Sequence, residues 1–361
     1  MCIKMKLTIS GSFFGTDGYS SHTRQLANAL GKYHDVKILT NLIPDWESKC
    51  NDFELEAIKK PDSKEVMICI GMPQSWPMFL SDRYKYFICF LVWEGDKIPD
   101  FWVDYIADKR VNQVWVPSEH TKLAVLKGTG GLYEDKLRIV PHGADINVFK
   151  PNPVKHDKFT FVCNKGWRGT SWDRGGVQHV IKAFSEEFKP EEPVELKLKL
   201  NPAYINLDIA KESIKRIVGK PCNIIINVED IKRKGINELY NSSDCYVSAQ
   251  LADAFDLCST EAMSTGLPVI VGGYGGQIEH VPDDCGFKLG FKLEKVQEDI
   301  MYEEVNWGTP NLDDLKSKMR WCFEHKQEIS EMGQKAREFI VNNFTWDMTA
   351  LKATKFLEEL K

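Results

Sequence analysis

Short apolar runs recur along the whole chain and predict its strands. In the first half these runs are Lys6–Ile9, Val36–Thr40, Val66–Ile70, Tyr86–Trp93, Gln113–Pro117 and Leu137–Val140. In the second half they are Phe159–Cys163, Glu195–Leu200, Cys222–Val228, Cys245–Ala249, Pro268–Gly272 and Phe287–Leu293. Most are rich in Val, Ile and Leu with little strict alternation, which is typical of parallel strands covered on both faces. The pattern predicts two parallel sheets of about six strands each.

Helical patterns lie between these runs. One example is the face formed by Leu26, Ala29, Leu30 and Tyr33, which repeat at the spacing of an α-helix. Alternating strands and helices predict an α/β protein whose parallel sheets are joined by right-handed crossovers.

Two prolines in the sequence Phe149-Lys150-Pro151-Asn152-Pro153 predict a linker between two domains, because proline fixes φ and interrupts a strand ladder. Residues 1–152 are then an N-terminal domain and residues 153–344 a C-terminal domain. Residues 345–361 predict a final helix with Trp346 and Leu357 on one apolar face. We expect that helix to cross back onto the first domain.

Composition narrows the class of protein. The 361 residues carry a net charge of −5, so the basic excess of a nucleic-acid-binding protein is missing. The ten cysteines contain no Cys-x2-Cys pair, which favours a reducing compartment and a cytoplasmic location. The strongest apolar run, Tyr86–Trp93, is too short to span a bilayer. Peripheral contact with a membrane stays open.

Glycine-rich turns follow the first strand of each half. The turn from Gly11 to Gly18 includes Gly15, and its backbone amides could approach an anion, although a tight turn needs glycine in any case. The second turn, residues 164–176, places Arg168 and Arg174 among glycines. Guanidinium groups match phosphate oxygens two at a time and can neutralise a departing diphosphate without a metal. The alternative is a solvated surface loop.

A third stretch, from Ala252 to Val281, brings carboxylates and glycines together. Asp253 lies in the loop after a strand, and Glu261 lies in the next helix, about two turns from its start. The free amides at such a helix start could hold a phosphate. Gly275-Gly276 opens another predicted helix, where the backbone can approach a ligand.

This stretch resembles the C-terminal signature of the retaining GT-B glycosyltransferases of family four (glycosyl transferases group 1). The matching segments are Glu261-Ala262-Met263, Gly266-Leu267-Pro268-Val269-Ile270 and Gly275-Gly276-Gln277-Ile278-Glu279. Arg168 and Arg174 match the family's Arg-x5-Lys phosphate pair, with Arg in place of Lys. The resemblance extends over nearly the whole chain. It implies a GT-B fold of two Rossmann-like, doubly wound domains that face a central cleft.

The resemblance also implies roles for individual residues. Asp253 takes the place of the carboxylate that contacts hydroxyls of the donor sugar, and Glu261 that of the carboxylate that holds the ribose. Donor binding further falls to Phe255, Asp256 and Leu257. The chain departs from the family here, because Asp253 is one methylene shorter than Glu and Asp256 replaces a glycine. Asp256 would repel a diphosphate unless it caps the helix and points away.

Residues outside this stretch complete the expected site. The nucleotide base is expected near Val228 and Asp230. In the first domain Glu94 follows a strand, where it either contacts acceptor or sugar or simply caps the next turn. His22 opens the first helix and could face the diphosphate, but a surface position is the favoured interpretation.

The function predicted is a retaining hexosyl transfer from a UDP- or GDP-linked sugar to a hydroxyl of a glycan, lipid or protein acceptor. We expect no cofactor and no metal, because the chain contains no Asp-x-Asp pair that could hold Mn²⁺. Two alternatives stay open. One is a non-catalytic subunit that binds nucleotide-sugar, and the other is a nucleotide-sugar epimerase.

Overall fold

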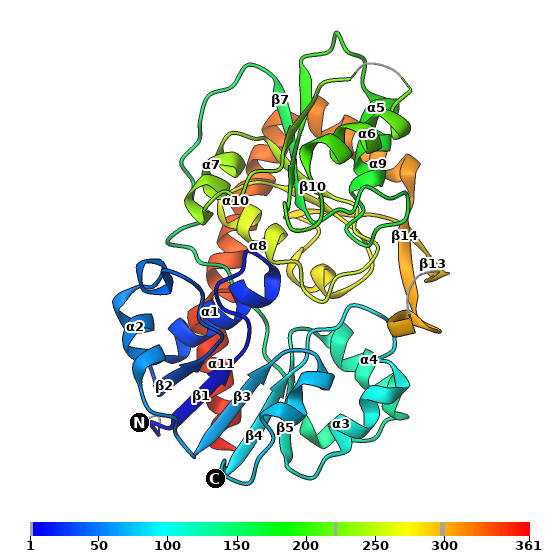
Figure 1. The fold of residues 1–361 in the computed structure, drawn as a ribbon. Helices are drawn as coiled ribbons and strands as arrows, with labels where there is room; N and C mark the ends of the chain where they lie inside the picture. The colour runs from blue at the N-terminus through cyan, green and yellow to red at the C-terminus, as the bar shows by residue number, and fades with distance from the viewer. Residues whose placement is uncertain (1–2, 220–221, 297–299) are drawn as a thin grey trace. The chain divides into compact units, whose positions relative to one another are not determined.

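The computed structural model describes residues 3–219, 222–296 and 300–361, and these form two compact units (Figure 1). The first unit comprises the described residues up to Gly143, residues 300–305 and Thr345–Lys361. The second unit comprises the rest of the described chain. The two prolines predict a boundary at residue 152, whereas the N-terminal stretch of the first unit ends at Gly143.

The first unit is built on a six-stranded parallel sheet, counted over the described residues, in the order β2-β1-β3-β4-β5-β6. Its strands are β1 (Lys6–Ser10), β2 (Asp35–Leu39), β3 (Val66–Ile70), β4 (Tyr86–Phe90), β5 (Val111–Val116) and β6 (Leu137–Ile139). Every residue of β3 is buried, as expected for a central strand covered on both faces. The strands that the apolar runs predicted in this half are confirmed.

Helices α1 (Gly18–Leu30) and α11 (Trp346–Glu358) lie next to one another in this unit (Figure 1). The α1 helix begins where the Asp17 carboxylate accepts a hydrogen bond from the Ser20 amide at 3.0 Å. The α11 helix buries the apolar face that the sequence predicted, including Trp346 and Leu357. The remaining helices and 3-10 turns are α2 (Asp52–Lys59), α3 (Val103–Ala107), α4 (Glu119–Thr129), η1 (Trp46–Lys49), η2 (Pro73–Met78), η3 (Asp100–Trp102), η4 (Glu134–Lys136) and η6 (Ile300–Tyr302).

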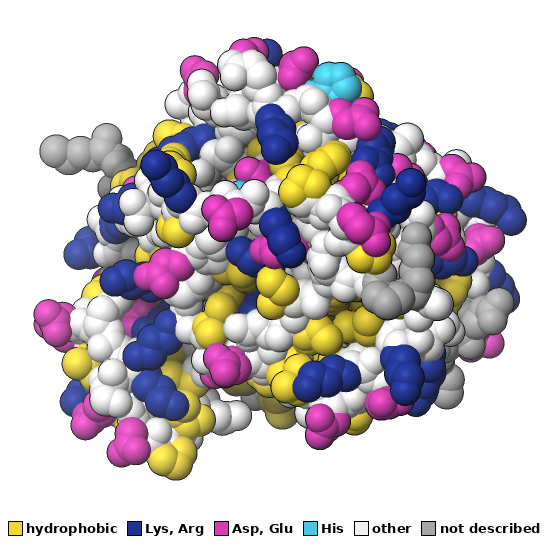
Figure 2. All heavy atoms as spheres, turned by 90° about the horizontal axis from the view of Figure 1, so that it is seen from above, with side chains coloured by type: hydrophobic (Ala, Val, Ile, Leu, Met, Phe, Trp, Pro, Cys, Tyr) yellow, Lys and Arg dark blue, Asp and Glu magenta, His cyan; other side chains and the backbone are white. Residues whose placement is uncertain are grey.

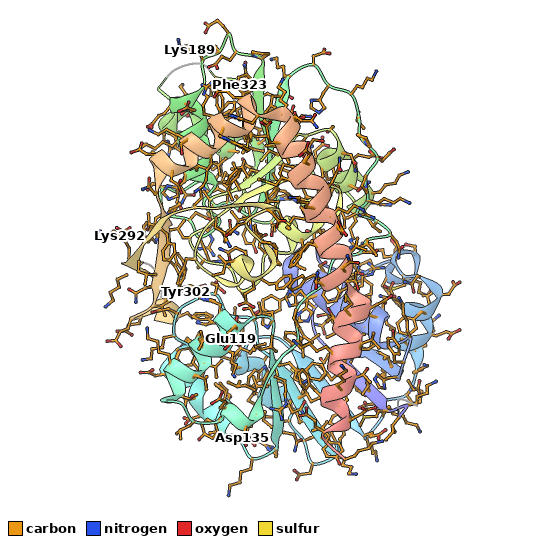
Figure 3. All side chains as sticks on the ribbon, turned by 180° about the vertical axis from the view of Figure 1, so that it is seen from behind. Glu119, Asp135, Lys189, Lys292, Tyr302 and Phe323 are labelled. Atoms are coloured by element: carbon orange, nitrogen blue, oxygen red, sulfur yellow. The ribbon has the colours of Figure 1, made fainter. Side chains whose placement is uncertain are left out.

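The second unit repeats the architecture around a second parallel sheet, in the order β12-β11-β10-β7-β8-β9 over the described residues. Its strands are β7 (Phe159–Lys165), β8 (Val194–Leu200), β9 (Ile224–Asn227), β10 (Cys245–Ser248), β11 (Val269–Val271) and β12 (Gly286–Lys288). Its helices are α5 (Val177–Glu187), α6 (Leu207–Ile217), α7 (Arg233–Asn241), α8 (Leu257–Ser264), η5 (Gly276–His280), α9 (Leu312–Glu324) and α10 (Lys326–Asn343). Phe323 of α9, labelled in Figure 3, lies 5.7 Å from the rings of Phe159 and Phe188 and closes one side of the core.

One predicted strand is wrong. The apolar run Phe287–Leu293 is two strands, because the chain leaves the large sheet at Gly290, whose amide donates to the Asp314 carboxylate at 2.7 Å. After this break β13 (Phe291–Lys295) pairs antiparallel with β14 (Asn306–Pro310), a strand that the apolar pattern missed. Apolar content alone does not reveal where a run changes its partner.

The proline-rich segment expected to be a linker is attached to α7. The Lys150 amide donates to the Asn237 side chain at 3.1 Å, and the Asn241 side chain donates to the Lys150 carbonyl at 3.0 Å. Phe149 is buried in the core of the second unit. These contacts hold the segment to the second unit, so the change of unit occurs earlier in the chain.

The surface is mixed in charge. Figure 2 shows Lys and Arg side chains interspersed with Asp and Glu side chains, and on the described part of that face neither sign forms a continuous patch. No helix in residues 3–219, 222–296 or 300–361 is long and apolar enough to cross a bilayer. The buried strand cysteines Cys69, Cys89, Cys163 and Cys245 are all free thiols, as their apolar surroundings predicted.

Candidate active site in the second unit

Three loops of the second unit meet because they follow adjacent parallel strands. The loops come after β7, β10 and β11, whose carboxyl ends lie at one edge of the sheet. The Leu251 amide donates to the Arg174 carbonyl at 2.9 Å, which joins the first loop to the second. The Gly276 amide donates to the Asp253 carbonyl at 2.8 Å, which joins the third. Asp253 therefore lies at the meeting point.

Two glycines allow this close approach. Gly176 has φ +72°, and a Cβ there would lie 1.9 Å from the Ala249 carbonyl oxygen. Gly275 has φ +119°, and a Cβ there would lie 2.6 Å from the Asp253 carbonyl oxygen. Any side chain at either position would be strained and would push the loops apart.

The two arginines of the β7 loop are held differently. Arg174 Nη1 donates to the Ala252 carbonyl at 3.1 Å and lies 4.0 Å from Asp253 Oδ2. Arg168 is exposed, and its side chain makes no hydrogen bond or ion pair with the part of the chain that the structure describes. Its backbone amide donates to Asp173 at 3.0 Å, which fixes the loop. The arrangement leaves Arg168 in solvent and turns Arg174 toward Asp253.

Asp253 has both carboxylate oxygens engaged. Oδ1 accepts from the amides of Phe255 at 3.2 Å and Asp256 at 2.9 Å, and Oδ2 accepts from Lys165 Nζ at 3.3 Å. Burial by itself would raise the pKa of Asp253, but Lys165 and Arg174 outweigh burial and lower it to about 2. Asp253 is thus a firmly ionised carboxylate with 24% of its side chain exposed.

Asp256 caps the helix, which resolves the repulsion that its charge would cause near a diphosphate. It has φ +69°, and its Oδ1 accepts from the Ser259 amide at 3.3 Å at the start of α8. Its Oδ2 accepts from the Gln250 side chain at 2.8 Å. The side chain is only 1% exposed, so the carboxylate points into the protein. Burial raises the pKa of Asp256, while Lys165 opposes that rise.

Lys165 is the residue that sequence reasoning missed. It ends β7, and its ammonium lies 2.7 Å from Asp256 and 3.3 Å from Asp253 with 8% of the side chain exposed. Burial disfavours the charged form, yet the two carboxylates keep the pKa of Lys165 above its ordinary value. A charged residue at the end of an apolar strand was the available signal.

Glu261 lies on α8 one turn from the start of the helix, closer than the two turns expected from sequence. It is half-buried, and among the described residues its carboxylate has no hydrogen-bond or ion-pair partner. Burial raises its pKa to about 7, although Arg233 acts in the opposite direction. An unpaired carboxylate in such a place can accept hydrogen bonds from ligand hydroxyls.

The other predicted donor residues have diverse surroundings. The Phe255 side chain is buried, and its ring lies 4.8 Å from that of His280. Its backbone rather than its ring is therefore available to a ligand. Leu257 is half-buried at the first position of α8. Val228 is half-buried against the core, and Asp230 is exposed. Both follow β9, which is the edge strand of the sheet opposite β12.

Glu94, in the first unit, has structural partners. It follows β4, and the Tyr302 hydroxyl donates to Glu94 Oε1 at 2.6 Å. The Tyr302 ring, labelled in Figure 3, stacks on Trp93 with ring centroids 5.0 Å apart. His120 Nε2 and the Glu94 carbonyl are 2.9 Å apart. Glu94 is therefore oriented by contacts on both its backbone and its side chain.

Gly15 lies just before α1, where a Cβ would come within 2.4 Å of Asp17 Oδ2 and 2.6 Å of the Ser20 hydroxyl. It permits the cap of that helix. His22 is only 1% exposed, which corrects the expectation of a surface histidine. Its ring lies 4.2 Å from those of Phe90 and His142, and burial lowers its pKa. The apolar neighbours that bury it come from distant parts of the chain.

Comparison with solved structures identifies the architecture. A glycosyltransferase from Rickettsia africae aligns over 99% of this chain and 98% of its own, with a TM-score of 0.75 and 18% identity. The chain has the GT-B fold. Anabaena HepE in complex with UDP-glucose aligns over 98% of this chain and 99% of its own, with a TM-score of 0.73 and 14% identity.

A third similar structure is sucrose-phosphate synthase from Thermosynechococcus elongatus, and the alignment covers 99% of this chain and 99% of that one, with a TM-score of 0.69 and 14% identity. No family model and no curated protein matches the sequence. The fold class expected from the sequence is thus confirmed, with two Rossmann-like units each built on a parallel sheet.

Proposed function

We propose that this protein is a retaining glycosyltransferase that moves a hexose from a UDP- or GDP-linked sugar to an acceptor hydroxyl without a metal. The observation that carries the proposal is the meeting of three loops at Asp253, two of them rich in glycine, beside Arg174 and the start of α8. Backbone amides at a helix start and guanidinium groups together suit a diphosphate. The solved HepE complex contains UDP-glucose in the same fold, which supports the donor class.

Each residue of the proposed site has a role that follows from its chemistry. Arg168 and Arg174 offset the negative charge that develops on the diphosphate as its bond to the sugar breaks. Glu261 accepts hydrogen bonds from the ribose hydroxyls, and Asp253 accepts one from a sugar hydroxyl through the lone pairs left on Oδ2. Phe255 and Leu257 contact the donor through their backbone at the start of α8. Val228 and Asp230 lie near the nucleotide base.

The reaction exchanges one bond for another at the anomeric carbon. The carbon–oxygen bond to phosphate breaks, and its electron pair goes to the diphosphate. The acceptor oxygen bonds to the same face of the sugar, and its proton passes to a phosphate oxygen. Glu94 is assigned to the acceptor or the sugar, and the acceptor is a glycan, lipid or protein hydroxyl. The free thiols in the described chain favour a cytoplasmic location.

The test begins with binding and turnover of UDP- and GDP-sugars. Binding is expected to raise the melting temperature by mass action. Turnover with an acceptor should give a product of the same anomeric configuration as the donor, read by NMR of the anomeric proton. Binding without turnover of any donor would instead favour the non-catalytic subunit, which the engaged oxygens of Asp253 would suit. Conversion of the nucleotide-sugar into its epimer would identify an epimerase.

A further inference from the structure

A buried lysine beneath the proposed donor site has no role in the proposed reaction. Lys165 Nζ lies 2.7 Å from Asp256 Oδ1 and 3.3 Å from Asp253 Oδ2, with 8% of its side chain exposed. A buried cation of this kind needs a partner, and one carboxylate would suffice. Here the ammonium contacts two carboxylates that differ in exposure, at 24% for Asp253 and 1% for Asp256.

The two carboxylates are held in unlike ways. Asp256 is fixed without Lys165, because Gln250 donates to one oxygen at 2.8 Å and the Ser259 amide donates to the other at 3.3 Å. Asp253 has only Oδ1 fixed by the backbone, through the amides of residues 255 and 256. A carboxylate held at one oxygen can still turn about that oxygen.

The second oxygen of Asp253 depends on Lys165. Among the described residues, Lys165 is the side chain that donates a hydrogen bond to Oδ2, whereas Arg174 Nη1 lies 4.0 Å away. That distance is beyond a hydrogen bond. Oδ2 is also the oxygen with lone pairs left for a ligand, because Oδ1 already accepts two amides. The orientation of this oxygen is therefore set by Lys165.

We propose that Lys165 is a positioning residue that holds Asp253 Oδ2 toward the donor sugar, with Asp256 as the buried anchor of the lysine. This inference rests on the proposed function, because it assigns a role in presenting the sugar rather than the nucleotide. Lys165 does not touch the donor. It acts through Asp253, and its positive charge also lowers the pKa of Asp253 and opposes the rise in the pKa of Asp256.

The competing explanation is that Lys165 only neutralises a buried carboxylate, and the two explanations can be separated. Lys165→Met leaves Asp256 buried without its partner, which is expected to lower the melting temperature by roughly 10 °C. Adding Asp256→Asn removes that uncompensated charge while keeping an N-cap residue that tolerates positive φ. The double variant should therefore regain most of the lost melting temperature.

The double variant should regain stability but not kcat. In the stable double variant kcat with the UDP- or GDP-sugar is expected to stay about 30- to 100-fold below wild type, since Asp253 Oδ2 is no longer held. The Kd of free UDP or GDP, measured by calorimetry, should change by less than about threefold. Lys197→Met is the matched control, because Lys197 lies on the neighbouring strand β8 and contacts the Ser242 carbonyl at 2.9 Å.

Each outcome decides between the explanations. Wild-type kcat in a stable double variant would overturn the positioning role and leave the proposed function standing. Equal loss of kcat in Lys197→Met would also overturn it, because the effect would then follow any truncated lysine of this sheet. If the wild-type protein neither binds nor turns over a nucleotide-sugar, the proposed function itself is wrong, and the inference falls with it.

Discussion

Replacing Glu261 with Gln is expected to stabilise the fold while it weakens nucleotide binding. The carboxylate is half-buried on α8, and among the described residues it has no hydrogen-bond or ion-pair partner. Burial raises its pKa to about 7 from an ordinary value of 4.5. The folded protein therefore keeps a proton that the unfolded chain releases. Glutamine has nearly the same shape but carries no charge to bury.

The sign of the effect follows from the direction of the pKa shift. As pH rises from 4.5 to about 7, the unfolded state loses its proton first, so wild-type stability falls. The interval corresponds to about 3 kcal/mol, taking about 1.36 kcal/mol for each pH unit. The Gln variant does not lose this stability, because its side chain has no proton to release. Its advantage in unfolding free energy should be near zero below pH 4.5 and approach about 3 kcal/mol above pH 7.

The assay is urea unfolding of both proteins at several pH values between about 4 and 8. Glu238→Gln on α7 is the matched control, because Glu238 is exposed and its loss should change the unfolding free energy little at any pH. In parallel, calorimetry with UDP or GDP should show a Kd raised about tenfold in Glu261→Gln, since the ribose loses a charged acceptor.

Two results would refute this reasoning. A Glu261→Gln variant that gains no more stability at high pH than Glu238→Gln would mean that the carboxylate is not destabilised by burial. Unchanged affinity for UDP and GDP, together with the expected gain in stability, would place the ribose elsewhere.

The other predictions concern charge, metal and acceptor. Arg168→Ala and Arg174→Ala should each lower kcat about 100-fold, and only the Arg174 change should also lower the melting temperature, because Arg174 alone of the two contacts the next loop; normal turnover in both would contradict the assignment. Asp253→Asn should spare the affinity for free UDP or GDP and weaken binding of the sugar-bearing donor, and equal loss for both ligands would count against it. Activity should survive excess EDTA with little response to added Mn²⁺, so a loss restored by metal would overturn the metal-free mechanism. Tyr302→Phe should lower kcat/KM for the acceptor several-fold by releasing Glu94 Oε1, whereas an altered donor KM alone would argue that Glu94 does not serve the acceptor.

Much of the fold could be predicted because its strands are buried on both faces. Runs such as Val66–Ile70 are apolar at every position, and the structure buries all of them. The α11 helix was also predictable, since a face containing Trp346 and Leu357 has to cover something apolar. The run Phe287–Leu293 misled because β12 and β13 are adjacent in sequence but belong to different sheets. Which strand pairs with which is decided by contacts between distant residues.

The candidate site, like the fold, could be predicted from the sequence only in part. Sequence placed Arg174, Asp253 and Glu261 in loops and a helix that follow adjacent strands, and the structure joins those loops at Asp253. It could not show that Lys165 would pair with Asp256, because the two are 91 positions apart. Nor could it show that His22 would be buried against Phe90 and His142.

Local chemistry therefore determined the elements and the residue types near the site, because strand periodicity, helix caps and glycine turns depend on neighbouring residues. The state of each functional group was decided only by tertiary structure. Asp253 is ionised with a pKa of about 2 and Glu261 has a pKa of about 7, although both are carboxylates in the same matched motif. The difference arises because Lys165 and Arg174 reach one carboxylate and burial dominates at the other, and both conditions exist only once distant segments have come together.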